Sequence, residues 1–134
     1  MSKVANDIQP IVTTDTTLTT STVIILTQVL DLQEALSGML HTTFKCSTAG
    51  TAGKVIHFYL LYSRDGVNFD EANVALMTEI GNFAIQADTN EHPVSIPLDG
   101  VTLSSKYAKL AVMCDNASNY GVLRSAYLSV RKAN

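Results

Sequence analysis

The chain has 134 residues, of which 46% are hydrophobic and only 16% are charged, and its formal net charge is −3 at pH 7. This length fits one domain that can bury a core without a metal or a disulfide. The small negative charge argues against direct binding to nucleic acid or to an anionic membrane. No apolar run approaches the roughly 20 residues of a membrane-spanning helix, and residues 1–10 lack the apolar stretch of a secretory signal, so we expect synthesis in a cytoplasm.

The N-terminal segment, residues 1–18, is rich in Thr and other β-branched residues. Thr suits a half-exposed, pleated strand, so we expect this segment to be extended. We separate it from a β-sandwich domain over residues 19–134. An extended segment of this kind could act as an arm that completes the exposed sheet edge of a neighbouring subunit.

Residues 29–40 show helical spacing. Apolar side chains recur there at intervals of three and four, at Val29, Leu32, Leu36 and Met39. Gly38 would end a helix quickly. The spacing therefore predicts one short helical turn between two strands.

The segments that follow have the patterns of strands. Residues 40–46 alternate, which places on one face Leu40, Thr42, Phe44 and Cys46, and on the other His41, Thr43 and Lys45. Residues 55–62 are apolar on both faces, so we expect both faces to be covered. Further strands are expected at 75–80, 82–87, 94–98, 107–115 and 122–132. In the last of these, the residues expected to point inward are Val122, Ala126, Leu128 and Val130.

The number and spacing of these strands indicate the fold class. Seven to eight short strands, separated by Gly, Asn and Pro, are typical of an all-β protein. Residues 115–121 are expected to form a hairpin loop between the last two strands. We predict an antiparallel β-sandwich of jelly-roll-like type.

The cysteines and histidines do not suggest a metal or redox site. Cys46 and Cys114 form no CxxC pair, so we expect two buried apolar thiols, with a cross-sandwich disulfide as the alternative in an oxidising compartment. His41, His57 and His92 lie in three separate segments without metal-ligand spacing, and we expect His57 to be a structural histidine. We expect no cofactor and no metal.

The segment RDGVNFDE, residues 64–71, gathers oxygen-bearing side chains. Asp65-Gly66 favours a sharp turn, because glycine readily adopts a positive φ. Asp65, Asn68, Asp70 and Glu71 could attract calcium, but their spacing is not that of a 12-residue EF-hand loop. A structural turn is the preferred interpretation.

Two aromatic residues in loops complete the candidate contact site. Phe69 lies in the segment 64–71, and Tyr120 lies in the loop expected at 115–121. Aromatic residues are enriched at contact surfaces. The candidate contact residues are Asp65, Asn68, Phe69, Asp70 and Tyr120. The sequence contains no nucleophile elbow, zincin motif, P-loop or dinucleotide-binding motif, so we expect no catalytic residues.

The stretch GTAGKVIHFYLLYSRDGVNFDEA resembles a group of small auxiliary virion proteins of tailed bacteriophages, among them capsid decoration, head-fibre and tail-associated proteins. In these proteins a Gly-rich loop precedes a hydrophobic strand, a Ser-x-Asp-Gly turn and an aromatic-Asp pair. The matching positions here are Gly50, Gly53, Val55 to Tyr62, Ser63, Asp65, Gly66, Phe69 and Asp70. The segment KYAKLAVMCDNASN is similar to a later strand of these proteins, which ends in an Asn-containing hairpin.

The resemblance implies a non-catalytic, jelly-roll-like subunit of the virion that is made in the host cytoplasm. Its partners would be major capsid or other virion proteins and further copies of itself, in a homo-oligomer. The resemblance carries over no catalytic residues. The alternative is a carbohydrate-binding β-sandwich module that recognises host surface glycans through Phe69 and Tyr120.

Overall fold

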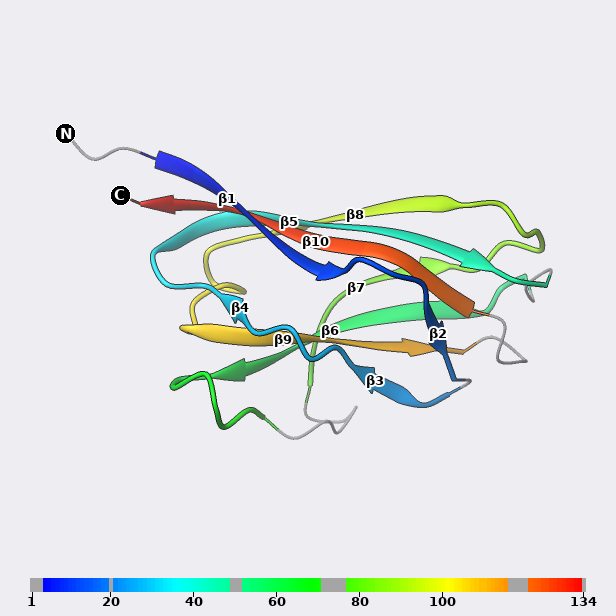
Figure 1. Cartoon of the computed structure of the whole chain (residues 1–134), viewed down its shortest axis with the longest axis horizontal. Helices are drawn as coiled ribbons and strands as arrows, with labels where there is room; N and C mark the ends of the chain where they lie inside the picture. The colour runs from blue at the N-terminus through cyan, green and yellow to red at the C-terminus, as the bar shows by residue number, and fades with distance from the viewer. Residues whose placement is uncertain (1–3, 20, 49–51, 71–76, 116–120, 134) are drawn as a thin grey trace.

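A computed structural model describes residues 4–19, 21–48, 52–70, 77–115 and 121–133, which form ten β-strands and no helix (Figure 1). In chain order the strands are β1 (Val4–Val12), β2 (Thr16–Leu18), β3 (Val23–Ile25), β4 (Leu30–Asp31), β5 (Ala35–Cys46), β6 (Val55–Ser63), β7 (Thr78–Ala84), β8 (His92–Leu98), β9 (Tyr107–Cys114) and β10 (Gly121–Ala133). Within the described residues, no helix is long and apolar enough to cross a membrane.

The strands form two antiparallel sheets that face each other. Sheet A has the order β1-β10-β5-β8, and β2 also pairs with β10. Sheet B has the order β3-β9-β6-β7, and β4 also pairs with β9. β1 and β2 pair with successive parts of β10, and β3 and β4 pair with successive parts of β9. The ten strands therefore occupy eight strand positions, four in each sheet. This order confirms the predicted jelly-roll sandwich, in which two of the eight strands are interrupted.

Alternation along the strands places the core between the sheets. In β5 the predicted inward set is buried, and the predicted outward residues are partly exposed. In β6 both faces are covered, as predicted, because Tyr59 and Leu61 join Ala111 of β9 in a second, smaller apolar cluster on the outer face of sheet B. The main core is formed by side chains from both sheets, with Phe44 and Phe58 among its largest fully buried members.

The predicted helical turn at residues 29–40 is wrong. The chain there forms β4, a tight turn and the start of β5. Leu30 and Leu32 are both buried, whereas Leu36 is 48% exposed. Buried side chains therefore recur every second residue from Leu30 to Leu32, as in a strand. Pairing of β4 with β9 and of β5 with β10 prevails over the weak local spacing.

Two further boundaries differ from the prediction. The two strands expected at 75–80 and 82–87 are one strand, β7, in the described part of this region. The hairpin expected at 115–121 is wrong, because β9 belongs to sheet B and β10 to sheet A. Successive strands with apolar inward faces can bury them by facing each other across a sandwich as well as by pairing within one sheet.

The inward face of β10 changes at a bulge. The register of β10 against β5 shifts between Leu123 and Ser125, so Leu123 enters the core with no exposed surface. Val122 is buried as well, at 8% exposure, but the core cluster contains Leu123, Ala126, Leu128 and Val130. Alternation counted back from Ala126 would place Leu123 on the outer face, so the sequence pattern alone could not have located the bulge.

Both cysteines are buried and no disulfide joins them, as expected for small apolar residues of the core. Cys46 ends β5 in sheet A, and Cys114 ends β9 in sheet B. Burial raises the pKa of the Cys46 thiol, so the thiol is kept in its neutral form.

The bulge gives a test of the core. We expect Leu123→Ala to lower the free energy of unfolding by about 2–5 kcal/mol, because it removes fully buried methyl groups. Ser125→Ala, on the other side of the bulge and partly exposed, should change it by about 0.5 kcal/mol or less. Urea unfolding measures both, and equal effects of the two substitutions would contradict the assigned bulge.

Candidate functional site

Three connections meet at one end of the sandwich, on the left in Figure 1. They are the β4–β5 turn (32–34), the first part of the β6–β7 connection (64–70) and the β8–β9 connection (99–106). Three hollows open at this end, of about 360, 230 and 460 Å³, and each is lined in part by the β8–β9 connection. We call this region the loop end.

Asp65 organises the first part of the β6–β7 connection. One of its carboxylate oxygens accepts hydrogen bonds from the backbone N–H groups of Val67 (2.9 Å) and Asn68 (2.8 Å) and from the Ser63 hydroxyl (3.0 Å). The other accepts one from the Asn68 side-chain amide at 2.9 Å. These bonds, led by that from the Asn68 backbone, hold the pKa of Asp65 well below its usual range. Gly66 has a φ of +77°, as the sequence predicted.

The same bonds favour the structural turn over calcium binding. The Asp65 carboxylate already accepts four hydrogen bonds from within its own loop. Asp70 closes the loop, since its N–H donates to the Tyr62 carbonyl at 3.0 Å and its carboxylate accepts from the Tyr62 N–H at 3.4 Å. Glu71 lies outside the described residues. Among those that are described, no group of three His, Cys, Asp or Glu side chains is placed to hold a metal ion.

The structure brings three of the five predicted contact residues together. Asp65, Asn68 and Asp70 line the hollow of about 360 Å³. Its other lining residues are Tyr62, Ser63, Arg64 and Ser105. Phe69 does not line this hollow, and its ring lies 4.4 Å from Lys109 Nζ, in a cation–π contact. Tyr120 lies outside the described residues.

Hydrogen bonds between the connections fix the loop end. The Tyr62 hydroxyl donates to the Thr102 carbonyl at 2.7 Å, and the Ser105 hydroxyl donates to the Ser63 carbonyl at 2.9 Å. Asp99 accepts from the Thr102 N–H at 2.8 Å, a bond that lowers the pKa of its carboxyl. Asp99 in the β8–β9 connection thus has the same role as Asp65 in the β6–β7 connection: each carboxylate accepts a hydrogen bond from a backbone N–H three residues later and so fixes its loop.

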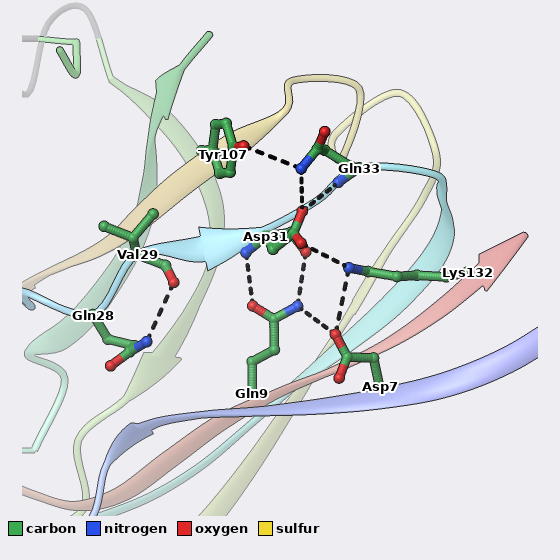
Figure 2. A network of polar contacts seen from close by, with 8 residues as sticks. All are labelled: Asp7, Gln9, Gln28, Val29, Asp31, Gln33, Tyr107 and Lys132. Atoms are coloured by element: carbon green, nitrogen blue, oxygen red, sulfur yellow. Dashed lines mark hydrogen bonds and ion pairs between the residues drawn. The ribbon is translucent and has the colours of Figure 1, made fainter. Parts of the chain in front are cut away.

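A polar network links the loop end to the edge of sheet A (Figure 2). The Gln33 side chain donates to the Tyr107 hydroxyl (3.1 Å) and to Asp31 (3.2 Å), which also accepts from the Gln33 N–H at 3.0 Å. On its other side, the Asp31 backbone pairs with the side-chain amide of Gln9 from β1. Burial raises the pKa of Asp31, but the bonds from Gln33 and the charge of Lys132 outweigh burial and lower it.

This network was not predicted from the sequence. Gln9 and Asp31 are 22 positions apart, and Lys132 is at the other end of the chain. These residues meet because β1 pairs with β10 in sheet A and because β4, in sheet B, lies close to β1. Spacing along the sequence cannot predict such a contact. Asp31 and Gln33, at and just after the end of β4, were the available signal, but Asp and Gln near a strand end are too common to indicate a specific contact.

The histidines have structural partners. His57 lies between Glu79 (2.5 Å) and Asp115 (3.5 Å), in accord with the expected structural role. His92 contacts Asp88 at 2.8 Å. His41 lies on the outer face of sheet A, where its ring stacks on that of Tyr127.

The outer face of sheet A is a second exposed surface. Strand register aligns two rows of residues across its four strands: Pro10, Tyr127, His41 and Ser95, and next to them Ile8, Ser129, Met39 and Pro97. Neither row contains Asp, Glu, Lys or Arg. Ile8 is 64% exposed and Tyr127 is 38% exposed, so this face presents apolar area together with hydroxyl groups.

Comparison with known proteins supports the fold. No protein-family model and no curated protein matches the chain. A chain in the structure of infectious bursal disease virus, Gx strain, is similar with a TM-score of 0.55 and 14% identity, over 98% of this chain and 32% of that one. Dimeric latent PorU from Porphyromonas gingivalis is similar with a TM-score of 0.52 and 8% identity, over 98% of this chain and 13% of that one. This chain therefore spans a third or less of these structures.

The Asp65 turn predicts a pH dependence. We expect Asp65→Asn to destabilise the protein at pH 7, because the amide loses the charge that the turn's N–H groups stabilise. The pKa of Asp65 is lowered from its ordinary value of about 3.9, so this stabilisation is complete above that value and is lost as pH falls toward the lower, folded-state pKa.

Urea unfolding of both proteins between pH 7 and pH 2 measures this effect. The difference in stability should stay constant down to about pH 5 and shrink below about pH 4. Asp70→Asn is the control and should cost less at pH 7, because among the described residues the Asp70 carboxylate accepts one bond, of 3.4 Å. A difference that is as large at pH 2 as at pH 7 would show that charge is not the cause.

Proposed function

We propose that this chain is a non-catalytic structural protein of the virion of a tailed bacteriophage. In this proposal it is a capsid-associated auxiliary or decoration subunit that acts through protein–protein contacts. The observation that carries the proposal is that nearly the whole chain is one jelly roll, and that its likeness to a chain of a virus structure extends over 98% of its residues. That likeness supports a virion role at the level of fold.

The phage assignment rests on the sequence resemblance, and the geometry gives its motif a physical meaning. Ser63, Asp65 and Gly66 of the Ser-x-Asp-Gly motif form one hydrogen-bonded turn at the end of β6. The motif therefore shapes a loop, and the described contacts of its side chains serve that loop. A motif that fixes the shape of an exposed loop suits a protein that functions by contact.

The loop end and the outer face of sheet A are the proposed contact surfaces. The loop end is held by hydrogen bonds between its connections, so little order has to be gained on binding. The outer face of sheet A is uncharged in its two central rows, so a partner can cover it without burying an unpaired charge. Major capsid or other virion proteins would be the partners. Symmetric attachment in many copies makes modest interfaces effective.

A second candidate function is binding to host surface glycans. The hollow of about 360 Å³ favours it, because carboxylate, amide and hydroxyl groups surround the Tyr62 side chain there. Sugars are bound by such polar groups together with an aromatic ring. A glycan array with the purified protein tests this candidate: binding that is lost in Asn68→Ala would favour the glycan module over the capsid subunit.

Co-sedimentation tests the leading proposal. Purified protein is mixed with capsids of the phage that encodes the chain, assembled without this protein. We expect saturable binding at a fixed number of copies per capsid. The Asn68→Ala/Asp70→Ala variant should bind at least about tenfold more weakly, which corresponds to about 1.4 kcal/mol.

Gln86→Ala provides the matched control, since Gln86 is exposed beyond the other end of β7. It should bind like the unaltered protein. Absence of saturable binding by the unaltered protein would overturn the capsid proposal. Equal binding by all three proteins would move the contact from the loop end to another surface.

A further inference from the structure

Strand β1 is attached to the sandwich by mostly polar contacts. It lies at the edge of sheet A, and β10 is its partner over Val4–Val12. On the side that faces sheet B, Asp7 and Gln9 are half-buried polar residues. At the end of the strand Val12 is buried in the core and Ile11 packs against it, whereas Ile8 on the opposite side is 64% exposed. Among the residues of β1 whose side chains are described, apolar contact with the core is therefore confined to Ile11 and Val12, and the rest of the strand lies outside the main source of stability in a fold of this size.

A small polar clasp fixes the position of β1 (Figure 2). The Gln9 side-chain amide donates to the Asp31 carbonyl and accepts from the Asp31 N–H, both at 2.7 Å, as a neighbouring strand would. Lys132 Nζ lies 3.4 Å from an Asp7 oxygen and 3.5 Å from an Asp31 oxygen. Partly exposed ion pairs of this kind contribute about 1 kcal/mol or less. The clasp therefore sets the register of β1 more than it resists removal of the strand.

The connection after β1 can serve as a hinge. Residues 13–15 are exposed and join β1 to β2, and both strands pair with β10. Leu18 of β2 is 1% exposed, so the chain is anchored in the core again directly after this connection. If residues 13–15 straighten, β1 leaves its own β10 while β2 stays in place. Short hinges of this kind favour exchange of an element between identical subunits.

We propose that β1 is exchanged between two copies of this chain, so that residues 4–12 of each copy pair with β10 of the other. A second copy is the fitting partner because it supplies the same β10 register and the same Asp31 and Lys132 positions. The exchanged dimer remakes every bond of the clasp between the two copies. The monomer and the dimer therefore differ in the conformation of the hinge, and the fraction of dimer rises with protein concentration. The biological setting rests on the proposed function, because many copies on one shell raise the local concentration.

The register of β1 supplies a direct test. Ile8 lies opposite Ser129, and both are on the outer face of sheet A, away from the clasp. Pro10, two residues on, lacks an N–H, which indicates that Ile8 and Ser129 form a non-hydrogen-bonded pair with closely spaced side chains. Cysteines at such a pair can form a disulfide without backbone movement.

The experiment mixes two single variants, Ile8→Cys and Ser129→Cys, in equal amounts under mild oxidation. A disulfide between positions 8 and 129 then joins two different chains, and exchange of β1 brings those positions together. We expect this mixed dimer to increase with protein concentration and to exceed at least about tenfold the yield from Ile8→Cys mixed with Gln86→Cys. Cys46 and Cys114 are buried, so they can be left in place.

Circular dichroism of each variant verifies that the fold is kept. If Ile8→Cys or Ser129→Cys does not fold, Pro10→Cys mixed with Tyr127→Cys is the substitute, because these two positions are the next opposed pair on the same face. Deletion of Thr14, which shortens the hinge, should raise the yield of mixed dimer. Equal yields from the two mixtures at all concentrations would overturn strand exchange. That result would leave capsid binding untouched, since the co-sedimentation assay measures it separately.

Discussion

Burial of one apolar layer between sheet A and sheet B governs the rest of the structure. Strands from both sheets direct alternate side chains into this layer, and Phe44 and Phe58 lie in it from opposite sides. Because the layer must be covered from both sides, the chain passes repeatedly from one sheet to the other, and β6 and β7 form the hairpin that stays within sheet B. The layer ends at β1, where Asp7 and Gln9 take the inward positions and polar contacts replace apolar ones.

Acidic side chains in and next to the loop end hold the backbone in shape. Asp31, Asp65 and Asp99 each accept backbone N–H groups a few residues further along the chain, and each has a lowered carboxyl pKa. Carboxylates held charged in this way are poor general acids at neutral pH. They are well suited to keeping exposed loops in one conformation, which the proposed contact role requires.

The sequence allowed prediction of those features that depend on local pattern. Alternation located β5 and β6 and their buried faces, and Asp65-Gly66 located the turn after β6. The helical turn failed because a spacing of three or four over a few residues is weaker than pairing with β9 and β10. The Gln9–Asp31 contact could not be predicted, since it exists only once the two sheets are stacked. Of the five candidate contact residues, three meet at one hollow because a single loop carries them.

The central claim is that this jelly roll is a component of a virion. The proposed role is tested by quantitative mass spectrometry of phage particles that are purified through a density gradient from a culture in which this chain is expressed from its native gene. The account predicts that the chain is present at a fixed ratio to the major capsid protein, as closed symmetry requires. Its absence from purified virions, while it is abundant in infected cells, would contradict the account.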